Sequence, residues 1–187
     1  MKVSKSAIRN ELRALRRQLA PRFVEAASSA VTAALHQCEC YRGAAALVAY
    51  ISTENEISVS GIFEDALESG RQLYLPSTSS PRRLKRWRPG EPLVIGRGGT
   101  LEPLQGDVAL PENPTLALVP LVAWDRSGTR LGRGGGFYDK LFADLGGSFR
   151  RVGIGYEFQY WPDLPCDSWD VNLHSVITEC RVVEFGQ

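Results

Sequence analysis

Apolar residues recur with a helical period near the start of the chain. Between Ser4 and Leu19 they are spaced by three or four residues, at Ile8, Leu12, Leu15 and Leu19. This spacing predicts an amphipathic helix that buries one stripe, with Ser4 as its N-cap. A second, alanine-rich helix is expected from about Pro21 to Gln37, since proline is favoured in the first turn of a helix.

Short apolar runs further along the chain predict buried strands. The run at 45–51 is almost wholly apolar, which is typical of a strand covered on both faces. The other expected strands are 72–76, 116–120 and 151–155, with short antiparallel strands within 77–115 and one within 175–185. Helices are expected at 58–69 and 137–145. This alternation predicts an α/β fold of three layers, α/β/α, with a mostly parallel central sheet and short antiparallel strands in the middle and the tail.

The composition is that of a globular protein. The chain has 187 residues, of which 43% are hydrophobic and 23% charged, so we expect one domain over 1–187. The values exclude a disordered chain, and no apolar run approaches the roughly 20 residues of a membrane span. The first residues lack the apolar stretch of a secretory signal, so we expect a cytoplasmic protein, without membrane attachment and monomeric.

Charge is distributed unevenly along the chain. The net charge is +1, but residues 1–22 carry +6, residues 82–88 carry +5 and the remainder carries −10. Two local basic patches favour a local anionic ligand over a general nucleic-acid surface, so a nucleic-acid partner is not expected. The segment 82–88, in which Trp87 interrupts the basic residues, is open to three interpretations: binding of single-stranded nucleic acid, binding of a polyanionic small molecule, or an exposed loop or strand edge protected by charge.

Cysteine and histidine give little support for metal or nucleophilic chemistry. The four cysteines are Cys38, Cys40, Cys166 and Cys180, and no pair has the spacing of a zinc knuckle or redox motif. His36 lies close to Cys38 and Cys40, but this cluster is interpreted as the polar end of a helix, because zinc ligands normally come as spaced pairs from separate elements.

The strongest motif is Arg-Leu-Gly-Arg-Gly-Gly-Gly-Phe-Tyr-Asp at 130–139. Glycines let the backbone approach a ligand, and successive N–H groups before a helix can surround phosphate oxygens. Arg130 and Arg133 add charged donors. The motif is neither a Walker A loop nor a dinucleotide fingerprint. The loop is therefore interpreted as an anion-binding loop, with a tight turn that binds nothing as the alternative.

Two further segments are candidates for the same site. Lys5, Arg9, Arg13 and Arg16 fall within an arc of about 80° on the first helix, beside its apolar stripe, either at the rim of a groove or on a solvated face. The acidic segment 53–56 follows the first buried strand, where open α/β sheets bind ligands. It is either an ordinary acidic loop or a segment in which Glu54 or Glu56 hydrogen-bonds a polar ring. Asp139 and Asp170 are candidate Mg²⁺ ligands.

Taken in order, these motifs resemble the 5-formyltetrahydrofolate cyclo-ligase family. The resemblance runs from Lys5-x-x-x-Arg9-x-x-x-Arg13 through Thr-Glu-Asn-Glu at 53–56 and Trp-Arg-Pro-Gly-Glu-Pro at 87–92 to the glycine-rich motif at 130–139. It ends with Gly-Ile-Gly-Tyr at 153–156 and Asp170-Val171. Gly98 falls near a position where the family often has an aromatic residue.

The resemblance implies an ATP- and Mg²⁺-dependent conversion of 5-formyltetrahydrofolate, with or without a polyglutamate tail, to 5,10-methenyltetrahydrofolate. The implied catalytic residues are Lys5, Arg130 and Arg133. The implied ATP contacts are Lys5, Ser6, Ala7, Ile8, Arg9, Arg130, Leu131, Gly132, Arg133, Gly134, Gly135, Gly136, Phe137 and Tyr138. The implied folate contacts are Ile51, Glu56, Arg133, Gly134, Gly135, Gly136 and Phe137, and the implied metal ligands are Asp139 and Asp170.

Overall fold

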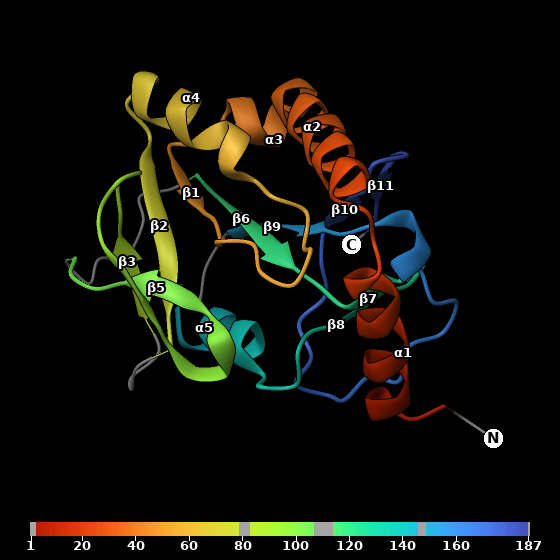
Figure 1. Ribbon diagram of the computed structural model, residues 1–187. Coiled ribbons are helices and arrows are strands. Elements are labelled where there is room, and N and C mark those ends of the chain that lie inside the picture. Colours follow the sequence, from red (N-terminus) through yellow and green to blue (C-terminus); the bar gives the residue numbers. More distant parts are fainter. Residues whose placement is uncertain (1–2, 79–82, 107–113, 146–148, 187) are drawn as a thin grey trace.

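The computed structural model describes residues 3–78, 83–106, 114–145 and 149–186. Within them, seven strands form one sheet in the order β11-β10-β9-β6-β1-β2-β3 (Figure 1). Their bounds are β1 Ala46–Val48, β2 Gln72–Ser77, β3 Arg83–Arg86, β6 Thr115–Pro120, β9 Phe149–Ile154, β10 Ser175–Ile177 and β11 Val182–Glu184.

The pairing of the strands confirms the predicted mostly parallel sheet. The five inner strands run parallel, with Leu47 of β1 in register with Leu73 of β2 and Leu116 of β6. The edge strands β3 and β11 are antiparallel to their neighbours. The tail therefore supplies two strands instead of the one expected, because a turn in which the Thr178 N–H donates to the Arg181 carbonyl reverses the chain.

Helices cover both faces of the sheet, which confirms the three layers. Helices α2 (Pro21–Gln37), α3 (Glu39–Arg42) and α4 (Phe63–Glu68) cover one face, and α5 (Phe137–Leu145) covers the other (Figure 1). Alternate strand residues point to opposite faces. Leu47 accordingly belongs to the core under α2, whereas its neighbour Val48 packs with Leu141 and Phe142 of α5.

Helix α1 (Lys5–Arg17) lies beside the sheet instead of on a face (Figure 1). It packs on the ribbon of β7 (Ala123–Trp124) and β8 (Arg130–Leu131), burying Ile8 and Leu12 against Leu131. Its start is as predicted, since the Ser4 hydroxyl accepts a hydrogen bond from the Ala7 N–H. α1 thereby places its basic stripe beside the loop that follows β8.

The remaining elements differ from the expected ones in their bounds. Of the expected strand 45–51, Ala46–Val48 form β1, and the chain leaves the sheet after Ala49 to line the cleft described below. The helix expected at 58–69 begins as the 3₁₀ turn η1 (Ser60–Ile62) before α4. Short antiparallel strands are expected within 77–115, and the described part of this segment has three of them. They are β3 and the paired strands β4 (Leu93–Ile95) and β5 (Leu101–Pro103). The 3₁₀ turn η2 (Arg97–Gly99) connects β4 to β5. A third 3₁₀ turn, η3 (Glu157–Gln159), follows β9.

The basic segment around Trp87 forms an edge of the sheet. In β3, Leu84 is buried while Lys85 reaches outward to donate to the Pro103 carbonyl. Trp87 is buried and packs edge-on against Phe63. The interpretation as a charged strand edge is confirmed for β3, and this tryptophan is not exposed for stacking; Arg82 lies outside the described residues.

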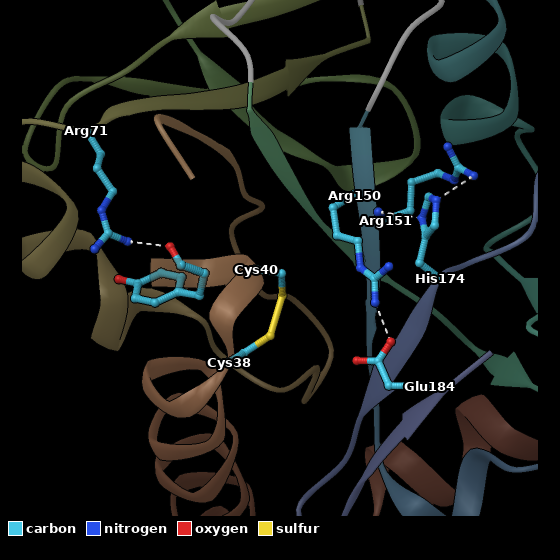
Figure 2. Close-up of a disulfide and its surroundings, with 8 residues drawn as sticks. Cys38, Cys40, Arg71, Arg150, Arg151, His174 and Glu184 are labelled. Atoms are coloured by element: carbon cyan, nitrogen blue, oxygen red, sulfur yellow. Dashed lines mark hydrogen bonds and ion pairs between the residues drawn. A yellow bond between two sulfur atoms is a disulfide. The ribbon is translucent and has the colours of Figure 1, made fainter. Parts of the chain in front are cut away.

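A disulfide joins Cys38 and Cys40 at the junction of α2 and α3 (Figure 2). Their spacing matches neither a zinc knuckle nor a redox motif, so the sequence analysis missed it. Cys38 ends α2 and begins α3, and this turn brings the two Cα atoms to 5.3 Å, within the usual range for a disulfide. The two cysteines line a hollow of about 690 Å³, here called the disulfide groove, with Arg150 and Glu184.

None of the described helices is long and apolar enough to cross a membrane.

Candidate active site

A cleft of about 680 Å³ opens where the parallel strands end. It is bounded by the segments that follow β1 and β6, by the end of β2, by α1, and by the loop between β8 and α5. The carboxyl end of a parallel sheet is where α/β folds bind ligands. The predicted site residues that line it are Lys5, Arg9, Ile51, Glu56, Arg130, Leu131, Gly132, Arg133, Gly134, Gly135, Gly136, Phe137, Tyr138, Asp139 and Asp170.

The glycine-rich loop presents bare backbone to this cleft. Gly134 and Gly136 have φ of 104° and 57°, which side-chain-bearing residues rarely adopt, so glycine is required there. In the described residues, no group accepts a hydrogen bond from the N–H of Gly134, Gly135 or Gly136. The loop leads directly into α5, whose first turn adds the positive end of a helix dipole. Unpaired N–H groups at the start of a helix are suited to bind an anion.

The basic residues of α1 turn toward the cleft, which decides between the two interpretations of the stripe. The Lys5 ammonium donates to Asp167 and Asp170, at 2.8 Å each. Arg9 donates from Nε to the Gly132 carbonyl at 2.8 Å, which places its guanidinium against the glycine-rich loop. The stripe therefore lies at the rim of a groove and fastens α1 to the loops of the cleft.

The segment after β1 makes a strained turn that caps α1. Glu54 and Asn55 have φ of 52° and 57°, an uncommon region for residues with a side chain. The Asn55 amide donates to the Arg16 carbonyl at 3.2 Å at the end of α1. Arg13 donates to both Glu54 carboxylate oxygens at 2.9 Å. Burial acts to raise the pKa of Glu54, but the hydrogen bonds from Arg13 and Arg17, together with the charges of Arg13 and Arg133, lower it.

A chain of charges connects α1 to the glycine-rich loop through Glu56. Arg16 is 1% exposed, and its Nη2 lies 3.6 Å from Glu56; no described residue forms a hydrogen bond with this nitrogen. Glu56 is 7% exposed and accepts hydrogen bonds from Arg133 at 2.9 Å and 3.2 Å. Arg133 also donates to the Thr53 hydroxyl. Burial lowers the pKa of the Arg16 guanidinium, but a guanidinium stays charged in proteins, so Glu56 lies between two cations.

The two predicted metal ligands are each paired with a predicted catalytic cation. Arg130, which is buried, donates to Asp139 Oδ1 at 2.7 Å, and the Val171 N–H donates to the same oxygen at 3.0 Å. Asp170 Oδ2 accepts from Lys5 and from the Asp167 N–H, at 2.8 Å each. Burial acts to raise the pKa of Asp170, but the hydrogen bonds from Lys5 and the Asp167 N–H, together with the charges of Lys5 and Arg130, lower it. Asp170 is therefore a carboxylate at neutral pH.

The two aspartates fit a magnesium ion that arrives with phosphates. The described hydrogen bonds use only Oδ1 of Asp139 and only Oδ2 of Asp170, which leaves one oxygen of each for a cation in the cleft. No group of three or more His, Cys, Asp or Glu in the described residues is arranged to hold a metal by itself. Mg²⁺ commonly takes one or two carboxylates and completes its shell with water and phosphate oxygens.

Three of the predicted ATP contacts lie outside the cleft lining. Ser6 and Ala7 are exposed, whereas the Ile8 side chain is fully buried between α1 and the ribbon of β7 and β8, away from the cleft. The sequence analysis also missed cleft residues, among them Arg97, Asp167 and Trp169. Asp167 and Trp169 directly precede Asp170, and that proximity was a usable signal. Arg97 carried none, because only the β4–β5 ribbon brings it to the cleft.

Comparisons with known proteins agree with this architecture. The family model described as "5-formyltetrahydrofolate cyclo-ligase family" matches residues 1–179. The 5-formyltetrahydrofolate cyclo-ligase of Haemophilus influenzae is 34% identical over 178 residues, covering 91% of this chain and 95% of that protein. The Escherichia coli K12 protein of the same name is 29% identical over 143 residues, covering 73% and 79%.

A solved structure supports the same relationship. The NMR structure of 5,10-methenyltetrahydrofolate synthetase from Aquifex aeolicus has a TM-score of 0.84 at 29% identity, covering 98% of this chain and 93% of that one. The similarity therefore extends over the sheet, both helical layers and the segments that build the cleft. By sequence and by fold, this chain belongs to the 5-formyltetrahydrofolate cyclo-ligase family.

Proposed function

We propose that this protein converts 5-formyltetrahydrofolate to 5,10-methenyltetrahydrofolate, consuming ATP with Mg²⁺ and releasing ADP and phosphate. The observation that carries the proposal is the glycine-rich loop, whose N–H groups at 134–136 face a cleft bordered by Lys5, Arg9 and Arg130. Backbone donors and fixed cations are what a triphosphate needs, and phosphoryl transfer depends mainly on alignment and on cations around the phosphate oxygens.

The residues of the cleft divide between two ligands. Lys5, Arg9 and Arg130 gather on the α1 side of the loop, where they would hold the phosphates. Ile51, Glu56 and Arg133 lie on the other side, toward η2. A carboxylate that accepts from a polar ring, as Glu56 would, is suited to a reduced pterin. The two substrates would therefore meet over the loop 133–137, which both use.

The proposed reaction requires mainly that the protein stabilise the negative charge of the phosphate groups. The formyl oxygen on N5 would attack the γ-phosphorus, with ADP as the leaving group, to give an imidate-like phosphate. N10 would then attack the formyl carbon, and inorganic phosphate would leave with the former formyl oxygen. Arg133 and the loop N–H groups are placed to stabilise the charge that develops on the transferred phosphoryl group. A magnesium ion held by Asp139 and Asp170 would neutralise phosphate charge.

The proposal includes the whole chain as one domain. Lys5 near the start and Asp170 near the end contact each other in the cleft, and the loop between them comes from the middle of the chain. A fragment that lacked either end would lose part of the site.

The test is a turnover assay that follows the absorbance of the methenyl product. We expect product only when 5-formyltetrahydrofolate, ATP and Mg²⁺ are all present, with one ADP released per methenyl group. A chelator of divalent cations should stop the reaction and added Mg²⁺ should restore it. Absence of turnover with folded protein, or turnover without ATP, would contradict the proposal.

A further inference from the structure

Trp169 stands out among the aromatic residues of the cleft because its side chain is not packed. It is 70% exposed, whereas Trp87 and Trp124 are buried in the core. Leaving a large apolar ring in water gives up the stabilisation of burying it. Trp169 nevertheless lines the cleft, at the end formed by Lys5, Asp167 and Asp170.

The turn that carries Trp169 is fixed by hydrogen bonds on both sides of it. The Asp170 N–H donates to the Asp167 carbonyl at 3.0 Å, and the Asp167 N–H donates back to the Asp170 carboxylate at 2.8 Å. Lys5 closes the turn by donating to both carboxylates. The tryptophan is thus presented at the tip of a turn that is anchored to α1.

The position of this turn along the cleft indicates what the ring meets. Arg133 holds the opposite side of the loop, through Glu56, Thr53 and the Gly98 carbonyl. A nucleotide whose phosphates lie on the loop 134–136 with Lys5 and Arg9 would extend its base away from that side. Its base would then reach the end of the cleft that Trp169 occupies.

We propose that Trp169 is the stacking platform for the nucleotide base and so determines affinity for a nucleoside triphosphate over a bare polyphosphate. This inference rests on the proposed function, because it takes the loop as the phosphate site. Stacking on an aromatic ring tolerates every base. The platform therefore selects for the presence of a purine or pyrimidine ring and not for its identity.

The experiment compares Trp169→Ala and Trp169→Phe with the unmodified protein by calorimetric titration with ATP and with inorganic tripolyphosphate. We expect Trp169→Ala to weaken ATP binding about tenfold and to leave tripolyphosphate binding unchanged. Trp169→Phe, which keeps a stacking face, should bind ATP within about threefold of the unmodified protein. Thermal unfolding should be the same for all three, since the ring is exposed.

Two results would overturn the inference. ATP affinity unchanged in Trp169→Ala would show that no base stacks there, and equal losses for ATP and tripolyphosphate would show that the substitution disturbs the phosphate site. Both are distinct from failure of the proposed function, which would appear as absent ATP binding and absent turnover in the unmodified protein.

Discussion

Two hollows of nearly equal size, about 680 Å³ and about 690 Å³, lie at opposite ends of the same sheet. The cleft lies where the parallel strands end, and the disulfide groove lies where β1, β6 and β9 begin. Each contains an ion pair between arginine and glutamate, Arg133 with Glu56 in the cleft and Arg150 with Glu184 in the groove (Figure 2). Volume and the presence of an arginine–glutamate ion pair therefore do not distinguish them.

The hollows differ in how their charges are held. Glu56 is buried between Arg133 and Arg16, and the same cleft is lined by Gly134, Gly135 and Gly136, whose N–H groups find no acceptor in the part of the chain that the structure describes. Arg150 and Glu184 are both more than a third exposed, so water screens their pair. Fixed, desolvated charges interact strongly with a ligand, because no water must be reorganised when the ligand's charge develops. We infer that burial of charge, not volume, marks the functional hollow.

The strongest test of the difference between the two hollows is to remove one arginine from each. Arg133→Ala should lower kcat/KM for methenyl formation about 100-fold or more, the usual cost of losing a donor to a developing charge. The fold should persist, since Glu56 keeps Arg16 and the Thr53 N–H as neighbours. The matched control, Arg150→Ala, should leave kcat/KM unchanged. Equal effects in the assay would mean that the charges of the two hollows are equivalent.

The sequence analysis predicted the glycine-rich loop but not the ion pairs and hydrogen bonds that surround it. The order and spacing of residues along the chain were enough to predict the three layers of the fold and the motif at 130–139. Both predictions rest on local properties, namely hydrophobic periodicity and the preference of glycine for loops. The partners of Lys5, Arg13 and Arg16 lie 38 or more positions away along the chain, and no local pattern encodes them. Ile8 was predicted to touch ATP, although its place in the apolar stripe of α1 already indicated burial.

The second prediction concerns stability and compares two neighbours on α1. Arg16→Met should lower the free energy of unfolding by about 3 kcal/mol, because it leaves Glu54 and Glu56 short of a buried cation. Arg13→Met removes an exposed pair with Glu54 and should cost about 1 kcal/mol or less. Urea denaturation of both variants measures the difference. Similar losses would indicate that Arg16 is not the cation that holds the turn.

The disulfide provides a smaller test in the other hollow. Replacing Cys38 and Cys40 with serine removes a link that closes a very short loop, so unfolding should become easier by only about 1–2 kcal/mol. Because the groove lies at the end of the sheet away from the cleft, kcat/KM should not change. A loss of activity in the double variant, or on reduction of the unmodified protein, would show that the two ends of the sheet are coupled.

The smallest expected effect is a pH dependence that originates beside the disulfide groove. His174 Nδ1 accepts a hydrogen bond from the Arg151 N–H at 3.0 Å, and burial, together with the charges of Arg151 and Arg150, lowers the pKa of His174 from 6.5 to about 4 (Figure 2). Between these two values the unfolded chain binds the proton that the folded chain does not. Stability from this group is complete above pH 6.5 and is lost as the pH falls toward 4.

His174→Asn tests this effect, because an amide oxygen can accept the Arg151 hydrogen bond without titrating. Between pH 7 and pH 5, the unmodified protein should lose on the order of 1 kcal/mol more unfolding free energy than the variant, a figure reduced for the partial exposure of the ring. Asp170 and Glu54 have lowered pKa values, so their protonation destabilises the fold only at more acidic pH. Both residues are present in the variant as well, so their contribution cancels in the comparison. Since His174 does not line the cleft, kcat/KM at pH 7 should be the same in both. Parallel stability curves would mean that folding does not lower the pKa of His174, and the pH dependence expected beside the disulfide groove would then be absent.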